Sequence, residues 1–233
     1  IKFQPTDGQA LGNTGTVTVD ITPVADAPTL SVAGNSVNSV GLLKEVWTNL
    51  SGLGTDGSGA SASTLKSVID AAGTPNSSSL ATNVQSDGNI TPGTASKTSG
   101  LIYLEAGKAY TFSGTGDDSL LVTIGGKNVA STTWGAGGNL NGTFTPTTSG
   151  YYTIDIYHHN QSGPGSYDVN LSVNGGAAVD LSNAGVPLYT GVTDLTNAGV
   201  SVSDLHGTNG EGYYDGYKPV SYTHLRAHET SLH

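Results

Sequence analysis

Two adjacent aspartates, Asp117 and Asp118, are the residues in this sequence best suited to chemistry. They close the segment Ser113-Gly114-Thr115-Gly116-Asp117-Asp118-Ser119, a glycine-rich turn that follows a strand pattern. Neighbouring side chains of a strand point to opposite faces, so an unusual backbone, such as a cis peptide bond, is needed to direct both carboxylates to one ligand. Ca²⁺ suits such a pair because it binds six to eight oxygen atoms, carboxylates among them. The alternative is an ordinary solvated turn.

A second group of polar residues lies in the loop His158-His159-Asn160-Gln161-Ser162-Gly163-Pro164-Gly165-Ser166. Its amide side chains and accessible carbonyl groups are hard oxygen ligands of the kind that calcium prefers. Two histidines could also suggest zinc, but adjacent residues of a strand face opposite ways and the chain has no cysteine. We therefore favour packing, or hydrogen bonding to a ligand, for these histidines.

The composition indicates an acidic protein rich in turns. The 233 residues include 34 glycines, 18 acidic residues and 8 basic ones, which gives a net charge of −10. Phosphate backbones and anionic lipid surfaces repel such a chain, so we expect neither nucleic acid nor membrane as a partner. No apolar run approaches the roughly 18 residues of a membrane span. A secreted domain without cysteine needs another stabilising element, such as a full core or bound calcium, although the cysteine count alone leaves the cytosol open.

Short strand patterns separated by turn residues predict the elements that must position these groups. The Gly125-Gly126 pair between two of them predicts a tight hairpin, and helical spacing over residues 65–72 ends at Gly73 and Pro75. We therefore expect an all-β antiparallel sandwich or barrel with one short helix and long loops. The strand patterns cover residues 101–104, 109–113, 120–124, 127–131, 142–144, 151–157 and 167–173.

Three segments are expected along the chain. Residues 1–29 hold a strand pattern at 16–22 and a proline-rich linker, and they resemble the end of a cadherin-like or immunoglobulin-like repeat of giant bacterial adhesins. In that setting Asp26 either holds calcium between neighbouring repeats or is a solvated carboxylate. Residues 30–218 form the main domain. Residues 219–233 carry three of the six histidines and resemble a translated sequencing adapter, so the zinc-like spacing of His224 and His228 is set aside.

The main domain resembles the lectin-type domain of the anthrax protective-antigen family over roughly residues 36–217. The resemblance is closest to the calcium-dependent sugar-binding module of giant bacterial RTX adhesins. It is carried by a spaced set of motifs: Gly41-Leu42 with Trp47-x-Asn49-Leu50, Tyr110-Thr111-Phe112-Ser113, Gly116-Asp117-Asp118-Ser119, Leu121-x-x-Ile124-Gly125-Gly126-Lys127, and Gly150-Tyr151-Tyr152-Thr153-Ile154-x-Ile156-Tyr157.

This resemblance implies a site. Asp117 and Asp118 match the family's cis-Asp pair and would hold Ca²⁺ through their carboxylates. Within the second calcium loop an amide oxygen of Asn160 or Gln161, and a carbonyl oxygen such as that of Gly163, would complete the protein ligands. Vicinal hydroxyls of a sugar would then bind the open side of the ion, beside Asp117, Asp118 and Gln161. His159 and Tyr157 are candidates for shaping the sugar pocket.

The function implied is a non-enzymatic, calcium-dependent carbohydrate-binding module of a secreted, cell-surface bacterial adhesin. It would bind fucose- or glucose-like sugars in cell adhesion and biofilm formation. Its partners would be surface glycans and the neighbouring domains of the same adhesin, and the module would be monomeric. A calcium-stabilised structural spacer and an accessory domain of a glycoside hydrolase are the alternatives. Intrinsic catalysis is not expected, because paired catalytic carboxylates face each other across a cleft rather than being adjacent in sequence.

Overall fold

The computed structural model describes residues 2–3, 15–16, 41–86 and 88–197. The chain divides into two units, residues 1–36 and 37–233. In the first unit, strands β1 (Lys2–Phe3) and β2 (Gly15–Thr16) pair antiparallel. The predicted linker with Asp26 and the C-terminal segment with His224 and His228 lie outside the described residues.

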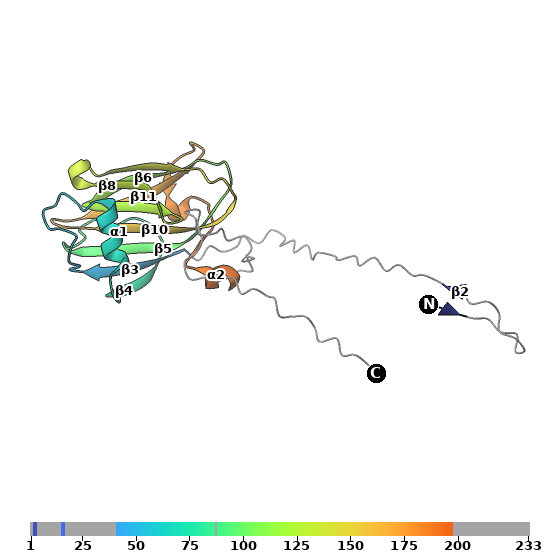
Figure 1. The fold of residues 1–233 in the computed structure, drawn as a ribbon. Helices are drawn as coiled ribbons and strands as arrows, with labels where there is room; N and C mark the ends of the chain where they lie inside the picture. Colours follow the sequence, from blue (N-terminus) through green and yellow to red (C-terminus); the bar gives the residue numbers. More distant parts are fainter. Residues whose placement is uncertain (1, 4–14, 17–40, 87, 198–233) are drawn as a thin grey trace, which may run out of the picture. The chain divides into compact units, whose positions relative to one another are not determined.

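Within the described part of the second unit, antiparallel strands form two sheets (Figure 1). The larger sheet has the strand order β4-β3-β5-β10-β7-β8, and the short strand β13 adds to β5. Its strands are β4 (Ser77–Ala81), β3 (Leu42–Thr48), β5 (Thr94–Leu104), β10 (Gly150–His159), β7 (Ser119–Ile124), β8 (Lys127–Thr133) and β13 (Leu188–Tyr189). The smaller sheet has the order β12-β11-β6-β9, with β12 (Val179–Asp180), β11 (Ser166–Val173), β6 (Tyr110–Asp117) and β9 (Asn139–Phe144).

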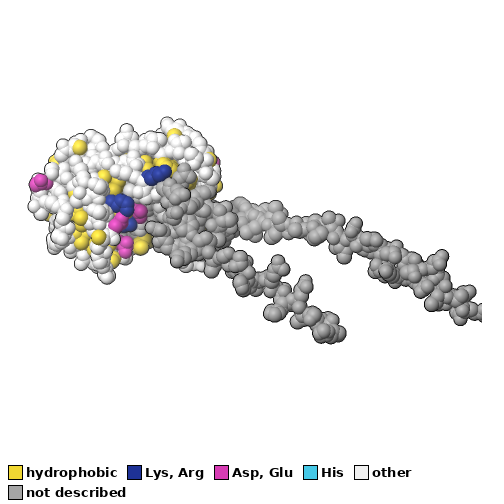
Figure 2. Space-filling model, viewed as in Figure 1, with side chains coloured by type: hydrophobic (Ala, Val, Ile, Leu, Met, Phe, Trp, Pro, Cys, Tyr) yellow, Lys and Arg dark blue, Asp and Glu magenta, His cyan; other side chains and the backbone are white. Residues whose placement is uncertain are grey.

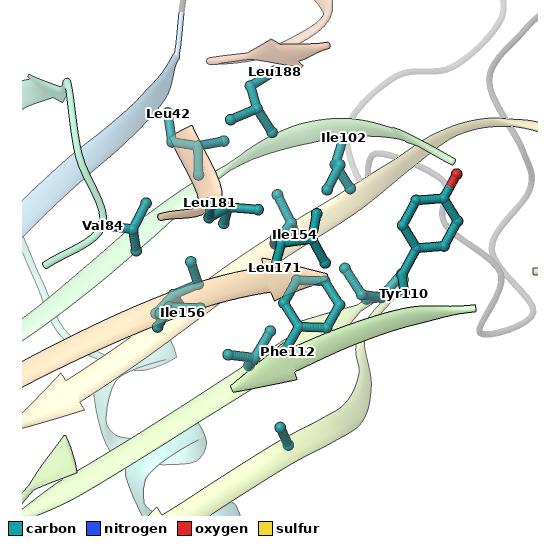
Figure 3. Packing of buried hydrophobic residues seen from close by; sticks show 14 of the residues in the cluster. Leu42, Val84, Ile102, Tyr110, Phe112, Ile154, Ile156, Leu171, Leu181 and Leu188 are labelled. Carbon is teal, nitrogen blue, oxygen red and sulfur yellow. The ribbon is translucent and has the colours of Figure 1, made fainter. Parts of the chain in front are cut away.

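The main core lies between the two sheets. Alternate residues of β6 and β11, such as Phe112 and Leu171, pack against β10 residues such as Ile154 (Figure 3). Val122 of β7 belongs to the same cluster. This period of two is what buries one face of each strand. Strand β7 is buried on both faces, because Leu121 on its other face belongs to a second cluster with the helix. The expected all-β sandwich is therefore confirmed.

Helix α1 (Ala62–Asp70) covers the outer face of the larger sheet (Figure 1). It begins three residues before the predicted start, because Ser61 caps it by accepting a hydrogen bond from the Thr64 amide. Leu65 and Ile69 face Leu121 and Tyr157 of the sheet. The expectation of one helix was incomplete, since a second short helix, α2 (Val192–Asn197), follows β13.

Two similar stretches, Asp180-Leu181-Ser182-Asn183 and Asp194-Leu195-Thr196-Asn197, differ in structure. The first contains the 3-10 turn η2 (Leu181–Asn183), whereas the second overlaps α2. The Gly125-Gly126 hairpin between β7 and β8 is confirmed, and both glycines have positive φ, at 57° and 75°. Among the described residues, no helix is long and apolar enough to cross a membrane. Figure 2 shows one face of the domain with few charged side chains.

Candidate functional site

The two sequence features meet where the chain crosses twice between the sheets. Strand β6 of the smaller sheet ends at Asp117, and β7 of the larger sheet begins at Ser119. The chain returns from β10 to β11 through residues 160–165. Because Ser119 pairs with His159 and Asp117 pairs with Ser166, the two crossings run side by side. The sheet register therefore places the aspartates against the loop that the sequence singled out.

The peptide bond between Asp117 and Asp118 is cis. Asp118 is 1% exposed, and its Oδ2 accepts hydrogen bonds from the amides of Gln161 at 2.6 Å and Ser162 at 3.0 Å. Its backbone is also fixed, since its carbonyl accepts from the Trp134 amide at 2.7 Å. The pKa of the Asp117 carboxyl is raised by burial and by the neighbouring Asp118 carboxyl. The two adjacent aspartates thus place several oxygen atoms close together on a backbone that hydrogen bonds hold in place.

Both aspartates line an open pocket of about 590 Å³. The pocket is formed by residues 56–58, Asp117 and Asp118, Trp134 and residues 162–164. Trp134 lies in the 3-10 turn η1 (Trp134–Ala136), and the residue is 57% exposed. Among the residues that line it, the pocket therefore combines carboxylates, hydroxyls and one aromatic ring, without a basic side chain.

Three of these lining residues, Asp56, Ser58 and Trp134, escaped the sequence analysis. Asp56 and Ser58 belong to a glycine- and serine-rich stretch that reads as low-complexity loop. The one available signal was that Asp56 is the single acidic residue of residues 51–63. Its Oδ1 accepts from the Ser58 amide at 3.0 Å and the Ser58 hydroxyl at 2.7 Å, and these bonds hold the pKa of its carboxyl below the ordinary value.

Gln161 connects the loop at residues 53–59 to the site by two hydrogen bonds. Its Oε1 accepts from the Gly59 amide at 2.9 Å, and its Nε2 donates to the Leu53 carbonyl, so one side chain bridges both ends of residues 53–59. Gly59 has φ of +93°, and a Cβ at this position would lie 2.4 Å from the Asp118 carbonyl oxygen. Only glycine permits this close approach. The loop is therefore packed directly on the aspartate pair.

Asn160 is fully buried at the start of the loop at residues 160–165. Its Nδ2 donates to the Gly163 carbonyl at 2.9 Å and to the Ile90 carbonyl, whereas its Oδ1 is buried without a hydrogen-bond partner. A buried acceptor without a partner is unfavourable and calls for a donor or a cation. The sequence left Asn160 and Gln161 as alternative amide ligands, and the Gln161 amide is already engaged at both of its polar atoms.

These oxygen atoms fit a calcium ion chemically. In the described residues no group of three or more His, Cys, Asp or Glu side chains could hold a metal, so a cation here would depend on amide and carbonyl oxygens as well. Ca²⁺ accepts that mixed set, whereas zinc prefers histidine and cysteine. Asp117, Asp118 and Gly163, which line the pocket, would hold it, and the unpartnered Oδ1 of Asn160, which is fully buried and not part of the lining, would complete the set.

The two histidines of β10 are packed rather than open. His158 is 1% exposed, its Nε2 lies 2.8 Å from the Asp117 carbonyl oxygen, and its ring lies 4.6 Å from that of Tyr167. Burial lowers the pKa of His158 to about 4 and also lowers that of His159. His158 thus supports the backbone of the aspartate pair as a neutral ring.

The structure does not bring Tyr157 to the pocket. Tyr157 is fully buried in the cluster under α1, and its hydroxyl donates to Asp70 Oδ1 at 2.9 Å. His159 is 2% exposed and, like Tyr157, is absent from the pocket lining. Neither placement supports the expected contact with a sugar.

No protein-family model and no curated protein matches the sequence. Among solved structures, the PA14 domain of the antifreeze protein MpAFP aligns with a TM-score of 0.51 and 24% identity, over 66% of this chain and 93% of that domain. The chain has the PA14 fold. The fold expected from the spaced motifs is thereby confirmed, and at this level of identity the likeness concerns the fold alone.

Two further solved structures align with lower scores. The PA14 sugar-binding domain from an RTX adhesin has a TM-score of 0.49 and 20% identity, over 60% of this chain and 94% of that domain. The A domain of epithelial adhesin 6 from Candida glabrata, solved in complex with Galβ1-3GlcNAc, has a TM-score of 0.47 and 15% identity, over 66% of this chain and 88% of that domain.

Proposed function

We propose that this PA14 domain is a calcium-dependent carbohydrate-binding module. The observation that carries the proposal is the convergence of Asp117 and Asp118 in one open pocket, beside a loop whose Asn160 leaves a buried amide oxygen without a partner. Asp117, Asp118, Asn160 and the Gly163 carbonyl are the proposed ligands of the ion. Gln161 is assigned to the loop instead, because both polar atoms of its amide are engaged there.

Calcium, when bound, would supply positive charge to which vicinal sugar hydroxyls can coordinate. The chain's own residues would orient the sugar. The exposed ring of Trp134 offers an apolar surface to the C–H face of a pyranose, and the hydroxyls of Ser58 and Ser162 offer hydrogen bonds at the pocket wall. This mixture of one aromatic surface and a few fixed polar groups is suited to a small polar ligand.

The proposal also covers where the module acts and in what kind of protein. An acidic, cysteine-free chain with a net charge of −10 suits a calcium-rich extracellular medium. We therefore propose a monomeric, non-enzymatic module of a secreted or cell-surface adhesin, which binds fucose- or glucose-like sugars on surface glycans during adhesion and biofilm formation. Neighbouring domains of the same adhesin would be its covalent partners.

Thermal unfolding tests the proposal in two steps. Extracellular calcium modules bind with a Kd of about 10⁻⁴–10⁻³ M, so 10 mM CaCl₂ should stabilise the domain by about 1.4–2.7 kcal/mol relative to EGTA. For a domain of this size the Tm should rise by roughly 3–10 °C. Methyl α-L-fucoside or methyl β-D-glucoside should add a further rise only when calcium is present.

The controls are single isosteric variants. Asp117→Asn and Asp118→Asn should abolish both shifts, whereas Glu105→Gln, which removes the same charge from an exposed site paired with Lys108, should keep them. A calcium shift without a sugar shift would instead identify a structural spacer. An unchanged melting temperature in CaCl₂ would refute the calcium site.

A further inference from the structure

The charges that line the pocket are all of one sign. Asp56, Asp117 and Asp118 contribute three carboxylates, and the other lining residues are glycine, serine, proline and tryptophan. Lys, Arg and His are absent from this set of lining residues. If the proposed calcium ion is bound, its two positive charges still leave an excess of one negative charge in the pocket. Charge of this kind discriminates between neutral and anionic ligands.

Asp56 supplies this excess charge, because the other two carboxylates face the proposed ion. Its position is fixed by short-range bonds: Oδ1 accepts from both the amide and the hydroxyl of Ser58. The Ser58 carbonyl in turn accepts from the Gly135 amide at 2.8 Å, which ties Asp56 to the turn that carries Trp134. The carboxylate is therefore held at the exposed wall of the pocket that it shares with Asp117, Asp118 and Trp134.

Hydrogen bonds hold both ends of the loop that carries Asp56. Gln161 bridges the Leu53 carbonyl and the Gly59 amide, and the Ala60 amide donates to Ser119 Oγ at 2.7 Å. A ligand with its own negative charge must therefore approach the Asp56 carboxylate, which is exposed but belongs to a loop whose two ends are held by hydrogen bonds. Because Asp56 is exposed at the pocket wall, its repulsion of a second negative charge should weaken the binding of an anionic ligand by no more than about tenfold at low ionic strength.

We infer that Asp56 is a specificity-determining residue, which makes the site select neutral sugars with vicinal hydroxyls and reject glycans whose carboxylate enters the pocket. This inference rests on the proposed function, since it concerns the same site. It assigns the ligand to neutral hexoses and deoxyhexoses rather than to uronic acids or sialylated glycans.

A matched pair of ligands tests the inference. Methyl β-D-glucoside and methyl β-D-glucuronide share their ring hydroxyls and differ only in whether C6 is an alcohol or a carboxylate. Titration calorimetry in excess CaCl₂ at low ionic strength should give a Kd about tenfold weaker for the glucuronide with the wild-type domain. In Asp56→Asn the ratio should fall to about two, and 0.5 M NaCl should reduce it in the wild type, because salt screens the exposed charge.

Glu105→Gln is the control, since it removes one negative charge outside the pocket and should preserve the tenfold ratio. Equal affinities in the wild type would overturn the inference, as would an unchanged ratio in Asp56→Asn. Tighter binding of the glucuronide, which is expected if its carboxylate joins the calcium ligands, would overturn it too. If neither glycoside nor methyl α-L-fucoside binds in a calcium-dependent way, the proposed function itself fails.

Discussion

Gln161 offers the sharpest test of how this site is built. The family resemblance implies Gln161 or Asn160 as an amide ligand of calcium, whereas the Gln161 side chain bridges the two ends of residues 53–59 through Leu53 and Gly59. Gln161→Ala removes both hydrogen bonds and leaves the Leu53 carbonyl and the Gly59 amide without these partners. The main effect should therefore be on the stability of the domain, and it should appear with or without calcium.

The size of the effect follows from those two bonds. An intramolecular hydrogen bond contributes about 0.5–1.5 kcal/mol net, and a buried group left without a partner costs about 1–3 kcal/mol. Gln161 is 6% exposed and Leu53 is 1% exposed, so the higher range applies to at least one of the bonds. We expect a loss of about 2–4 kcal/mol in the free energy of unfolding, which corresponds to a Tm lower by roughly 5–15 °C.

Urea unfolding in EGTA and in 10 mM CaCl₂ measures this loss. Gln161→Met serves as the control for volume, because it keeps the length of the side chain but neither hydrogen bond, and it should lose nearly as much stability as Gln161→Ala. The stabilisation added by calcium should persist in both variants. The reasoning is refuted if Gln161→Ala unfolds like the wild type in EGTA but gains nothing from calcium, since that result would make Gln161 a ligand.

Three further perturbations test the scaffold around the site. Gly59→Ala places a Cβ 2.4 Å from the Asp118 carbonyl at φ +93°, so it should cost about 2–4 kcal/mol of unfolding free energy, whereas Gly73→Ala, whose Cβ would meet nothing within 4 Å, should cost under about 1 kcal/mol. Tyr157→Phe removes the bond to Asp70 and should cost about 1–2 kcal/mol in the same urea assay, and an unchanged midpoint would contradict it. Burial raises the pKa of Asp70, but hydrogen bonds from two lysines and Tyr157 outweigh it and leave that pKa below its ordinary 3.8. The stabilisation that Asp70 contributes is therefore present above pH 3.8 and is lost as the pH falls below that value. Between neutral and acid pH, the free energy of unfolding should therefore fall less in Asp70→Asn than in the wild type, as measured by acid unfolding.

The sequence predicted most strands because their residues alternate between the core and the opposite face. The predicted strand at residues 101–104 is longer in the structure, where β5 begins at Thr94. Its first half holds Ser96 and Thr98, which are buried although polar, in a strand that lies between β3 and β10 in the larger sheet. Hydropathy alone does not indicate a strand whose buried positions are filled by hydroxyls.

The loop at residues 51–61 could not be predicted in the same way. Its glycines leave the backbone free to adopt many conformations in isolation, and its place is decided by bonds to residues about a hundred positions away, such as Gln161. Asp56 therefore looked like an ordinary loop residue. Similarly, Trp134 lies in a short 3-10 turn, and its position at the pocket depends on the bond from its amide to Asp118.

By itself the sequence determined the class of fold through its period-two patterns, and it singled out the Asp117-Asp118 pair and the loop at residues 160–165 through their residue types and the resemblance of the spaced motifs. Tertiary structure alone decided which groups share the pocket. The pairing of β7 with β10 and of β6 with β11 brings the two crossings together and buries Asn160, and the same packing turns Tyr157 toward α1. Such contacts join residues far apart in the chain, so they cannot be predicted from local sequence patterns.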